Sequence, residues 1–543
     1  MRKTNKPWFL QYDQGVPAEI VIPDLTLVDL LKDAVTTHGS STCTITNQEK
    51  LTYFQIDDNS DRVARFLLEN GLNKGDRVGV LLLNSPAFVI SYFGILKAGG
   101  VVMALNPAYR PNEIRKLAIE SGIRILILQE SAYQEIKPVQ PETFIEMMVV
   151  VGRKSVLPDS DDLSWGDLLQ RYSDGDPIET LVKPEDPAVF QYSGGTTGTP
   201  KCAIGLHRNL VANVYQFSHW LVNIEPGQEK VLVVIPLYHV YGMVLGMNLA
   251  VKIKSSMILI SNPRDMEGLL HAVEEFKATV FPGVPNIYAA INHYPKVLAG
   301  EYDLSSIKAC ISGSATLPVR VKREFEALTN GHLVEGYGLS EAPTATHCNP
   351  ILGENREGSI GLPLPNVDCK IVDLETGTIE MDVGEPGELI IQGPQVMSGY
   401  HQRPEETEVA LRDGWLYTGD VAKMDQDGYF YLVDRKKDVI KVGGFQVWPN
   451  EIEAVIRQHP KVCEAAVAGV SDPEGKEAAK AWIVLQKGAI CTSEEIKEFC
   501  KKYLTGYKIP RYIEFRDNLP KTTVGKVLRR VLVSEHSHKM NEG

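Results

Sequence analysis

The sequence lacks the features that mark several other kinds of protein. Its eight cysteines are scattered without a C-x-x-C pair, and no H-E-x-x-H string occurs, so neither a disulfide framework nor a zinc site is indicated. The N-terminus has no apolar core typical of a secretory signal, and no low-complexity segment or short repeat is present. We therefore expect reduced thiols and a cytoplasmic protein.

An excess of positive charge is also absent. Lys plus Arg number 56 against 69 for Asp plus Glu, a net charge of −13, which disfavours binding to nucleic acid or to an anionic membrane. Residues 436–543 nevertheless carry +5, and the rest carries −18. A basic part beside an acidic body is compatible with a lid that brings cations to an anionic substrate, and equally with ordinary surface solvation.

One stretch, residues 231–251, contains no Asp, Glu, Lys or Arg and is long enough to span a bilayer. Pro236, His239, Gly242 and Gly246 interrupt it. A buried strand, a loop and a buried helix fit this pattern better, so we expect no transmembrane segment.

The order of apolar segments predicts the fold. A chain of 543 residues is too long for one small core. Apolar strands alternate with helices over roughly the first 360 residues, which is typical of doubly wound parallel sheets. Short strands separated by turns follow. We expect an α/β fold: a large N-terminal domain (1–435) of two doubly wound α/β subdomains plus a β subdomain, then a small mobile α+β domain (436–543).

Residues 192–201, YSGGTTGTPK, predict a phosphate-binding loop. Glycines let successive N–H groups turn inward toward an anion, hydroxyls add further donors, and Lys201 adds a positive charge. The loop is not that of the P-loop NTPases, because the G-K-[ST] string is missing. A purely structural turn would need fewer hydroxyl groups. We expect a helix to follow the loop.

At this string the sequence resembles the acyl-adenylate-forming superfamily, which contains acyl-CoA synthetases, luciferases and the adenylation domains of peptide synthetases. Further strings follow in that family's order over nearly the whole chain. They are PLYHVYG (236–242), SGSATL (312–317), EGYGLSE (335–341), GWLYTGD (414–420), DRKKDVIKVGG (434–444) and PKTTVGKVLRR (520–530).

The resemblance implies an ATP site in which the loop covers the outer phosphates, Tyr337 lies against adenine and Asp420 binds the ribose hydroxyls. It also implies a Mg²⁺ site at Glu341 and Ser193. The implied ATP or AMP contacts are Ser193, Gly194, Thr196, Thr197, Lys201, Gly313, Ser314, Ala315, Glu335, Gly336, Tyr337, Gly338, Ser340, Asp420, Leu432, Arg435, Lys437, Lys441 and Lys526. The family often has Thr at Ser340, whose hydroxyl is retained.

Three residues are implied as catalytic: Lys526, Glu341 and His239. The resemblance implies that Lys526 swings in from the small domain, that Lys437 is the hinge, and that Gly443 and Gly444 receive CoA. Without the resemblance, each has an ordinary alternative. Glu341 fits the N-terminus of a helix, Asp420 a turn, His239 the core, and Lys526 a solvated face.

The resemblance is strongest to fatty-acyl-CoA synthetases, which use ATP, Mg²⁺ and CoA. The expected function is activation of a fatty acid through acyl-AMP, followed by transfer to CoA. An aryl- or branched-acid CoA ligase is the nearest alternative, a luciferase-type oxygenase is another, and a non-catalytic nucleotide-binding protein belongs to a different class. Monomer and homodimer both remain open.

Overall fold

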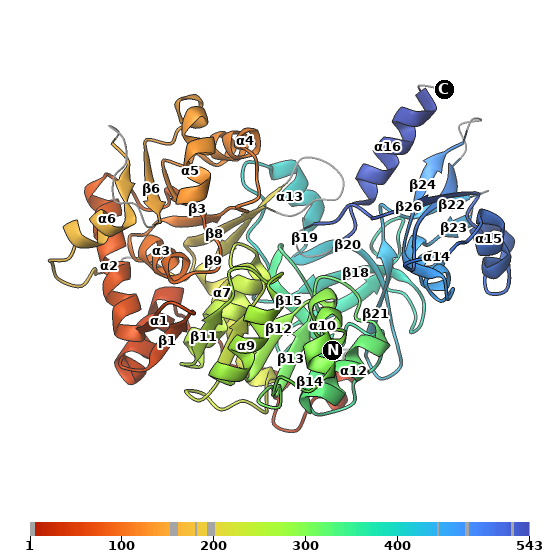
Figure 1. Ribbon diagram of the computed structural model, residues 1–543, viewed down its shortest axis with the longest axis horizontal. Coiled ribbons are helices and arrows are strands. Elements are labelled where there is room, and N and C mark those ends of the chain that lie inside the picture. Colours follow the sequence, from red (N-terminus) through yellow and green to blue (C-terminus); the bar gives the residue numbers. More distant parts are fainter. Residues whose placement is uncertain are drawn as a thin grey trace.

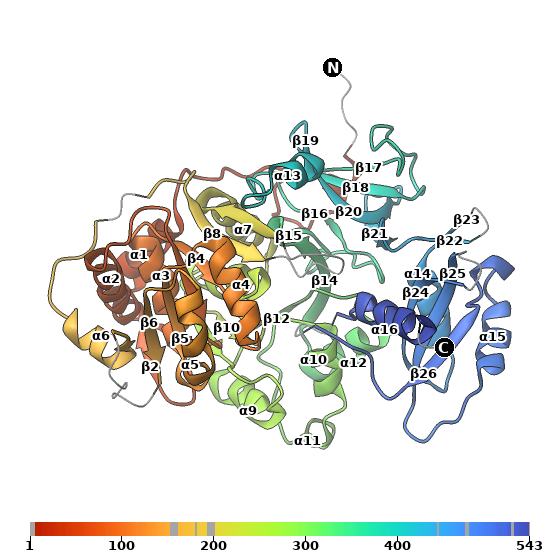
Figure 2. The same ribbon diagram turned by 90° about the horizontal axis from the view of Figure 1, so that it is seen from above.

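The computed structural model describes residues 6–152, 161–179, 182–192, 201–442, 445–472, 477–522 and 526–541. These residues form a large body and a smaller C-terminal lobe beside it (Figure 1 and Figure 2). Sheets flanked by helices build the body, and the lobe combines helices with a two-stranded and a three-stranded sheet. The α/β class expected from the sequence is confirmed.

The first layer of the body is a seven-stranded sheet in the order β7-β6-β5-β3-β4-β8-β9. All neighbours are parallel except β8 and β9. The strands are β3 (Arg77–Leu81), β4 (Val101–Ala104), β5 (Ile125–Gln129), β6 (Met147–Val151), β7 (Leu163–Ser164), β8 (Pro187–Tyr192) and β9 (Cys202–Leu206). The helices of this layer are α2 (Tyr53–Glu69), α3 (Pro86–Lys97), α4 (Pro111–Ser121), α5 (Glu130–Ile136) and α6 (Trp165–Arg171). Every residue of α3 is buried, because it contacts β3, β4 and helix α2.

A nine-stranded sheet in the order β16-β15-β14-β13-β12-β10-β11-β1-β2 forms the second layer. Its strands are β1 (Thr42–Ile45), β2 (Lys50–Thr52), β10 (Lys230–Val233), β11 (Ser256–Leu259), β12 (Val280–Gly283), β13 (Ala309–Ser312), β14 (His332–Leu339), β15 (Ala342–Cys348) and β16 (Leu362–Pro363). Its helices are α1 (Leu27–His38), α7 (His207–Trp220), α8 (Leu249–Lys252), α9 (Met266–Phe276), α10 (Pro285–Asn292), α11 (Pro295–Leu298) and α12 (Val319–Thr329). One buried apolar cluster extends through both layers.

Residues 231–251 take the form expected from the sequence. The strand β10 leads through a loop to a buried π-helix, Gly242–Asn248, which continues into α8. Both helical segments are buried among apolar neighbours. Among the residues described, no helix is both long and apolar enough to cross a membrane.

The segment after the phosphate loop differs from the expectation. A strand, β9, follows the loop, and the helix α7 begins only at His207. Tyr192 at the end of β8 lies opposite Cys202 at the start of β9. The prediction of a helix directly after the loop was therefore wrong, because pairing with β8 overrides the local pattern of a short apolar run.

The third part of the body is a five-stranded antiparallel sheet. Its elements are β17 (Asp368–Val372), β18 (Gly387–Gln392), α13 (Pro404–Ala410), β19 (Leu411–Arg412), β20 (Trp415–Met424) and β21 (Phe430–Arg435). This sheet is the β subdomain expected from the sequence, and β21 is the last strand before the lobe.

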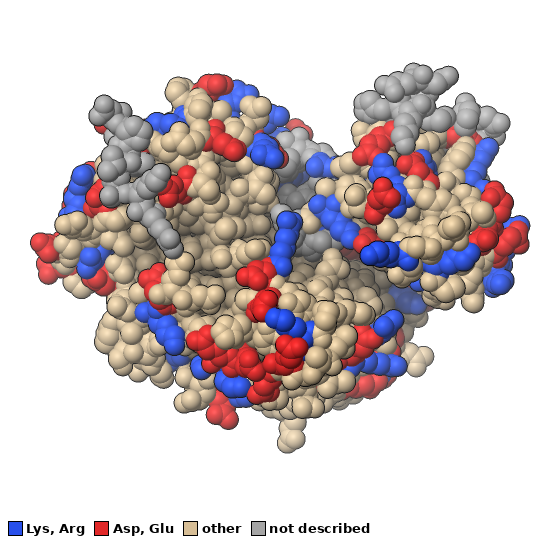
Figure 3. Space-filling model, in the orientation of Figure 1, with Lys and Arg blue, Asp and Glu red and all other residues tan. Residues whose placement is uncertain are grey.

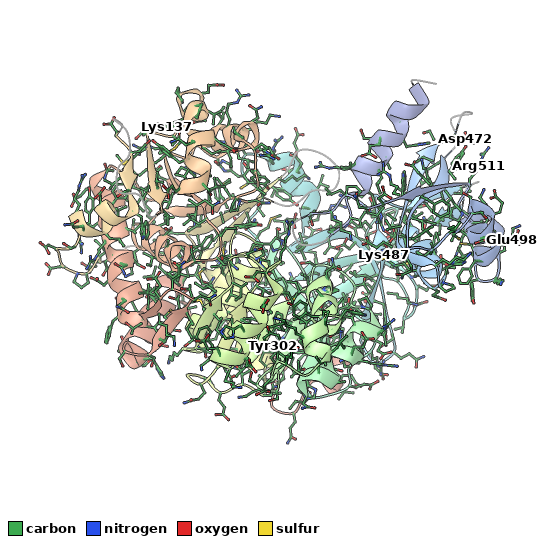
Figure 4. All side chains as sticks on the ribbon, in the orientation of Figure 1. Lys137, Tyr302, Asp472, Lys487, Glu498 and Arg511 are labelled. Atoms are coloured by element: carbon green, nitrogen blue, oxygen red, sulfur yellow. The ribbon has the colours of Figure 1, made fainter. Side chains whose placement is uncertain are left out.

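The C-terminal lobe has apolar clusters of its own, separate from that of the body. It consists of β22 (Ile440–Val442), β23 (Phe445–Val447), α14 (Pro449–Arg457), β24 (Val462–Ser471), β25 (Glu477–Leu485), α15 (Ser493–Lys501), β26 (Tyr512–Arg516) and α16 (Arg529–Asn541). Asp472 and Arg511, labelled in Figure 4, pair 2.5 Å apart within the lobe.

Candidate active site

A buried carboxylate, Asp420, lies where two sheets of the body meet. Its side chain accepts a 2.6 Å hydrogen bond from the Tyr337 hydroxyl and pairs with Arg435 Nε at 3.1 Å. Asp420 lies opposite Arg435 in the pairing of β20 and β21, whereas Tyr337 comes from β14. Asp420 is thus in a strand, and the turn suggested by the TGD string is not found. Burial and the Asp420 charge raise the pKa of Tyr337, which stays a neutral donor.

The glycines beside Tyr337 allow the backbone to approach its neighbours closely. A Cβ at Gly338 would lie 1.7 Å from the Thr344 carbonyl oxygen, and one at Gly336 would lie 3.3 Å from that of His347. Neither close approach tolerates a side chain without displacement of the β14–β15 hairpin. The hairpin therefore fixes the position of the Tyr337 ring, with the buried His347 ring against its edge.

Ser340 and Glu341 form the turn of this hairpin, between Leu339 and Ala342, which face each other. Glu341 is therefore not at the N-terminus of a helix. Its Oε1 accepts a 2.9 Å hydrogen bond from the hydroxyl of Tyr400. The ammonium group of Lys201 lies 5.0 Å from the centre of the Tyr400 ring. Tyr400 thus contacts both the partly exposed Glu341 carboxylate and Lys201, the last residue of the predicted phosphate loop.

The 313–315 loop follows β13, and the ring of Tyr241 packs against it. Ser314 has a φ of +69°, which turns the chain sharply. A Cβ at Gly313 would lie 3.2 Å from the Tyr241 ring, whose hydroxyl donates to the carbonyl of Ile311 at 2.6 Å. Glu335 lies opposite Ser312 in the next strand, and burial raises the pKa of its carboxyl group to about 8.

His239 is partly exposed at the start of the buried 239–252 segment. Desolvation lowers the pKa of its imidazole to about 4, so it is neutral at pH 7. The Tyr241 N–H donates to Nδ1 at 3.2 Å, which places the proton of the neutral ring on Nε2. The side chain can therefore donate from Nε2 without carrying charge.

Lys526 reaches from the lobe toward the carboxylate of the body. Its N–H donates to Thr522 Oγ1 at 3.1 Å, and its carbonyl accepts from the Thr522 N–H at 2.8 Å. Burial, and then the nearby charges of Arg435 and Lys437, lower the pKa of its ammonium group to about 8, and Asp420 opposes this shift. The structure thus brings Lys526 together with Asp420 and Arg435.

The remaining candidates differ in position. Lys437 lies near Arg435; partial burial, and then the charge of Arg435, lower the pKa of the Lys437 ammonium group. Leu432 is 37% exposed on β21. Lys441 has an exposed side chain, and its backbone N–H donates to Glu477. Lys and Arg side chains are visible along the edge of the lobe that faces the body (Figure 3).

Six candidates lie outside the described residues. They are Ser193, Gly194, Thr196, Thr197, Gly443 and Gly444. Two residues of the site were missed. Tyr400 contacts Glu341 from 59 positions away in the sequence, and no local pattern connects them. Arg529 lies in the string 520–530 but was given no role.

Arg529 links the lobe to the strand that leads into it. It donates to Asn450 Oδ1 at 2.6 Å and Glu453 Oε1 at 2.7 Å, and contacts Asp438 at 3.2 Å and Asp434 at 3.7 Å. The carboxyl group of Asp434 is buried, which raises its pKa to about 6. Residues on both sides of Lys437 thus share one guanidinium.

An aromatic ring, a buried carboxylate and converging cations define the class of this site: it suits a phosphorylated ligand that carries a vicinal diol. Comparison of the sequence with models of known protein families agrees with this class of ligand. The model of the AMP-binding enzyme family matches residues 31–401, and that of the AMP-binding enzyme C-terminal domain matches residues 451–526. The chain belongs to the AMP-binding enzyme family.

The similarity to individual proteins extends over nearly the whole chain. It is 40% identical to a long-chain-fatty-acid–CoA ligase of Bacillus subtilis (strain 168), with 98% of this chain and 99% of the relative covered. It is 32% identical to 4-coumarate–CoA ligase 2 of Nicotiana tabacum, with 98% of each covered.

Among solved structures, the ATP-bound crystal structure of MatB from Rhodopseudomonas palustris has a TM-score of 0.85 at 29% identity, covering 95% of this chain and 99% of that one. The apo structure of the same protein, with the same coverage and identity, has a TM-score of 0.73. The present chain therefore superposes better on the ATP-bound structure than on the apo structure.

Proposed function

We propose that the chain is an ATP-dependent acyl-CoA synthetase that activates a fatty acid, acting in the cytoplasm. In the first step a carboxylate oxygen attacks the α-phosphorus of ATP, the bond to the β-phosphate oxygen breaks, and pyrophosphate leaves. In the second step the CoA sulfur attacks the acyl carbon, AMP leaves with the bonding electron pair, and the thiol proton passes to solvent. The eight cysteines, all within the described residues, form no disulfide, which supports a reducing compartment.

The observation that carries this proposal is the convergence of Lys526 with Asp420 and Arg435 across the junction between body and lobe. Asp420 offers two oxygens, which suit the two ribose hydroxyls. Tyr337 presents the ring for adenine. Lys526 supplies a compact ammonium where negative charge gathers between the carboxylate and the α-phosphate, which is a stabilisation that acts mainly in the transition state.

The residues also fit Mg²⁺. A magnesium ion in a nucleotide site usually takes one or two carboxylates together with phosphate oxygens and water. Glu341 provides such a carboxylate, partly exposed and oriented by Tyr400 on one oxygen. We assign Glu341 as the protein ligand, with the Ser193 hydroxyl as a second. When bound, Mg²⁺ would neutralise part of the triphosphate charge.

We assign the acid pocket to the apolar segments 238–247 and 284–288 and to the 313–315 loop. Tyr238, Val284 and Ile287 lie in the same apolar cluster as the Tyr241 ring under the 313–315 loop. An apolar pocket suits an alkyl chain, and the names of the relatives support a long-chain fatty acid. His239, neutral at pH 7, donates a hydrogen bond at the carboxylate end. An aryl acid is the second candidate, favoured by the similarity to the coumarate ligase.

We place the boundary between the two domains at residues 435 and 436. The apolar cluster of the body ends at Tyr431, and that of the lobe begins at Ile440. Lys437 lies between them and is the proposed hinge, while Gly443 and Gly444 are the proposed contacts of the CoA arm.

A substrate panel tests the proposal. Purified enzyme is given ATP, Mg²⁺ and CoA with acids from C2 to C18 and a set of aromatic acids, and both pyrophosphate release and CoA consumption are measured. We expect both to depend on a fatty acid. A preference for aromatic acids would favour the second candidate, and no acid-dependent pyrophosphate release with any acid would refute the ligase.

A further inference from the structure

We propose that Tyr400 is a positioning residue that holds the Glu341 carboxylate for its metal. This inference deepens the proposed function and rests on the metal role assigned to Glu341. The Tyr400 hydroxyl donates to Glu341 Oε1 at 2.9 Å, so that oxygen is turned toward the ring and the other oxygen is presented for coordination. A carboxylate fixed in this way binds a cation at a lower cost in side-chain entropy.

The backbone around Tyr400 is itself held on two sides. The N–H of Met397 donates to the Glu341 carbonyl at 2.8 Å, which joins this segment to the hairpin turn. On the other side, Ile204 donates to the Gly399 carbonyl at 2.9 Å and His401 donates to the Cys202 carbonyl at 2.8 Å. The segment therefore connects the turn that carries Glu341 with β9, the strand that leaves the phosphate loop.

The ring of Tyr400 extends this connection to a cation. Lys201 lies over the ring, 5.0 Å from its centre, where the electron-rich face attracts an ammonium group. One side chain thus contacts the metal carboxylate through its hydroxyl and the loop lysine through its ring.

The position of Tyr400 is fixed by a further hydrogen bond. Its N–H donates to Thr407 Oγ1 at 2.9 Å, and that hydroxyl donates to the Arg403 carbonyl at 2.8 Å. The ring packs in a small apolar cluster with Ala203, Ala342 and Met397. The hydroxyl is consequently aimed by the fold and need not be ordered when ligand binds.

The test is the metal affinity of a variant without the hydroxyl. Full-length Tyr400→Phe and wild type are titrated with Mn²⁺ in the presence of α,β-methylene ATP, which cannot be cleaved, and bound Mn²⁺ is followed by electron paramagnetic resonance. We expect the Mn²⁺ dissociation constant to rise about tenfold, the effect of one hydrogen bond to a charged group. The Mg²⁺ concentration for half-maximal pyrophosphate release should rise by a similar factor, with the rate at saturating Mg²⁺ largely restored.

Tyr417→Phe is the matched control. The Tyr417 hydroxyl donates to the Gly377 carbonyl at 2.9 Å, away from Glu341, and is also half-buried. Its metal titration should equal that of wild type. In a Glu341→Gln background, Tyr400→Phe should cause no further loss, because its effect passes through the carboxylate.

An unchanged Mn²⁺ affinity in folded Tyr400→Phe would overturn the proposal. It would also be overturned if Tyr400→Phe lowered the Mn²⁺ affinity of Glu341→Gln by the same factor as that of wild type. If Tyr400→Phe does not fold, Thr407→Val replaces it, and unchanged affinity in that variant likewise overturns it. The Mn²⁺ titration requires no acid. Failure of the ligase proposal in the substrate panel is therefore separate from failure of the role of Tyr400.

Discussion

The body and the lobe hold their functional groups in different ways. In the body, Asp420 is buried and fixed by partners from β14 and β21, strands of two different sheets. In the lobe, the backbone of Lys526 makes two hydrogen bonds to Thr522. Under the proposed function, the body would hold a preorganised nucleotide site, and the lobe would deliver the Lys526 cation and withdraw it again.

The junction between the body and the lobe is consistent with separate roles for the two parts. The two parts have separate apolar clusters. Across residues 434–438 the contacts are mostly charged: Lys436 pairs with Glu388 at 2.7 Å, and Arg529 links Asp434 with Asp438. Charged groups at such a junction can exchange their partners with water at little cost, so this junction would permit rotation about the proposed hinge.

Removing the delivered cation should have the largest effect. Lys526→Ala is expected to slow acyl-adenylate formation by about 10² to 10³, the usual effect of a lost electrostatic contact to a transition state. Formation of the thioester from preformed acyl-adenylate should be nearly unchanged, since it does not use this cation. Single-turnover measurements of both half-reactions decide this, and equal losses in the two would contradict the division of roles.

Removing the fixed carboxylate should have the next largest effect. Asp420→Ala is expected to raise the KM for ATP by about 10- to 100-fold. It should also lower the free energy of unfolding by ~1–3 kcal/mol, because Arg435 and the Tyr337 hydroxyl lose their acceptor. Steady-state kinetics and urea unfolding measure the two effects. Asp427→Ala serves as the control: it removes a half-exposed partner of Arg356 from the turn between β20 and β21, and it should change neither quantity.

The charge of Lys526 should give the first half-reaction a pH dependence. Because its pKa is lowered to about 8, the ammonium is mostly charged at pH 7 and mostly neutral at pH 9. The kcat/KM for adenylation should therefore fall about tenfold per pH unit above pH 8. In Lys526→Arg the guanidinium stays charged. Its kcat/KM for adenylation should be lower than that of wild type but constant over this pH range. A falling profile in Lys526→Arg as well would assign the titration to another group.

The smallest effect is expected at Lys441, which the sequence placed among the ATP contacts. Its side chain is exposed, and its backbone N–H donates to Glu477. Lys441→Ala should change the rate of adenylation by less than about twofold. A loss comparable to that of Lys526→Ala would show that the lobe delivers two cations.

Much of the fold followed from apolar periodicity. The buried strands of the first layer, such as Arg77–Leu81, and the helices between them were expected because their burial on both faces leaves a continuous apolar pattern. The strand β9 was missed, since five small and apolar residues read equally well as helix or strand until their partner is known.

For the candidate site, the sequence strings predicted which residues take part but not which residues they contact. Asp420, Tyr337 and Arg435 meet as an ATP site requires, although their roles remain predictions. The short strand at 414–420 was expected, but the hairpin turn at Glu341 was not, because tertiary pairing of β14 with β15 sets it. Tyr400 and Arg529 act through contacts with residues more than 50 positions away in the sequence, which no local pattern reveals.

The central claim is that body and lobe enclose one nucleotide between Asp420 and Lys526. A crystal structure with ATP and Mg²⁺ tests it most directly. The account predicts the ribose hydroxyls on the Asp420 carboxylate, the metal on Glu341 and the Lys526 ammonium within hydrogen-bond distance of the α-phosphate. A nucleotide bound elsewhere, or one that leaves Asp420 and Lys526 without contact to it, would contradict the account.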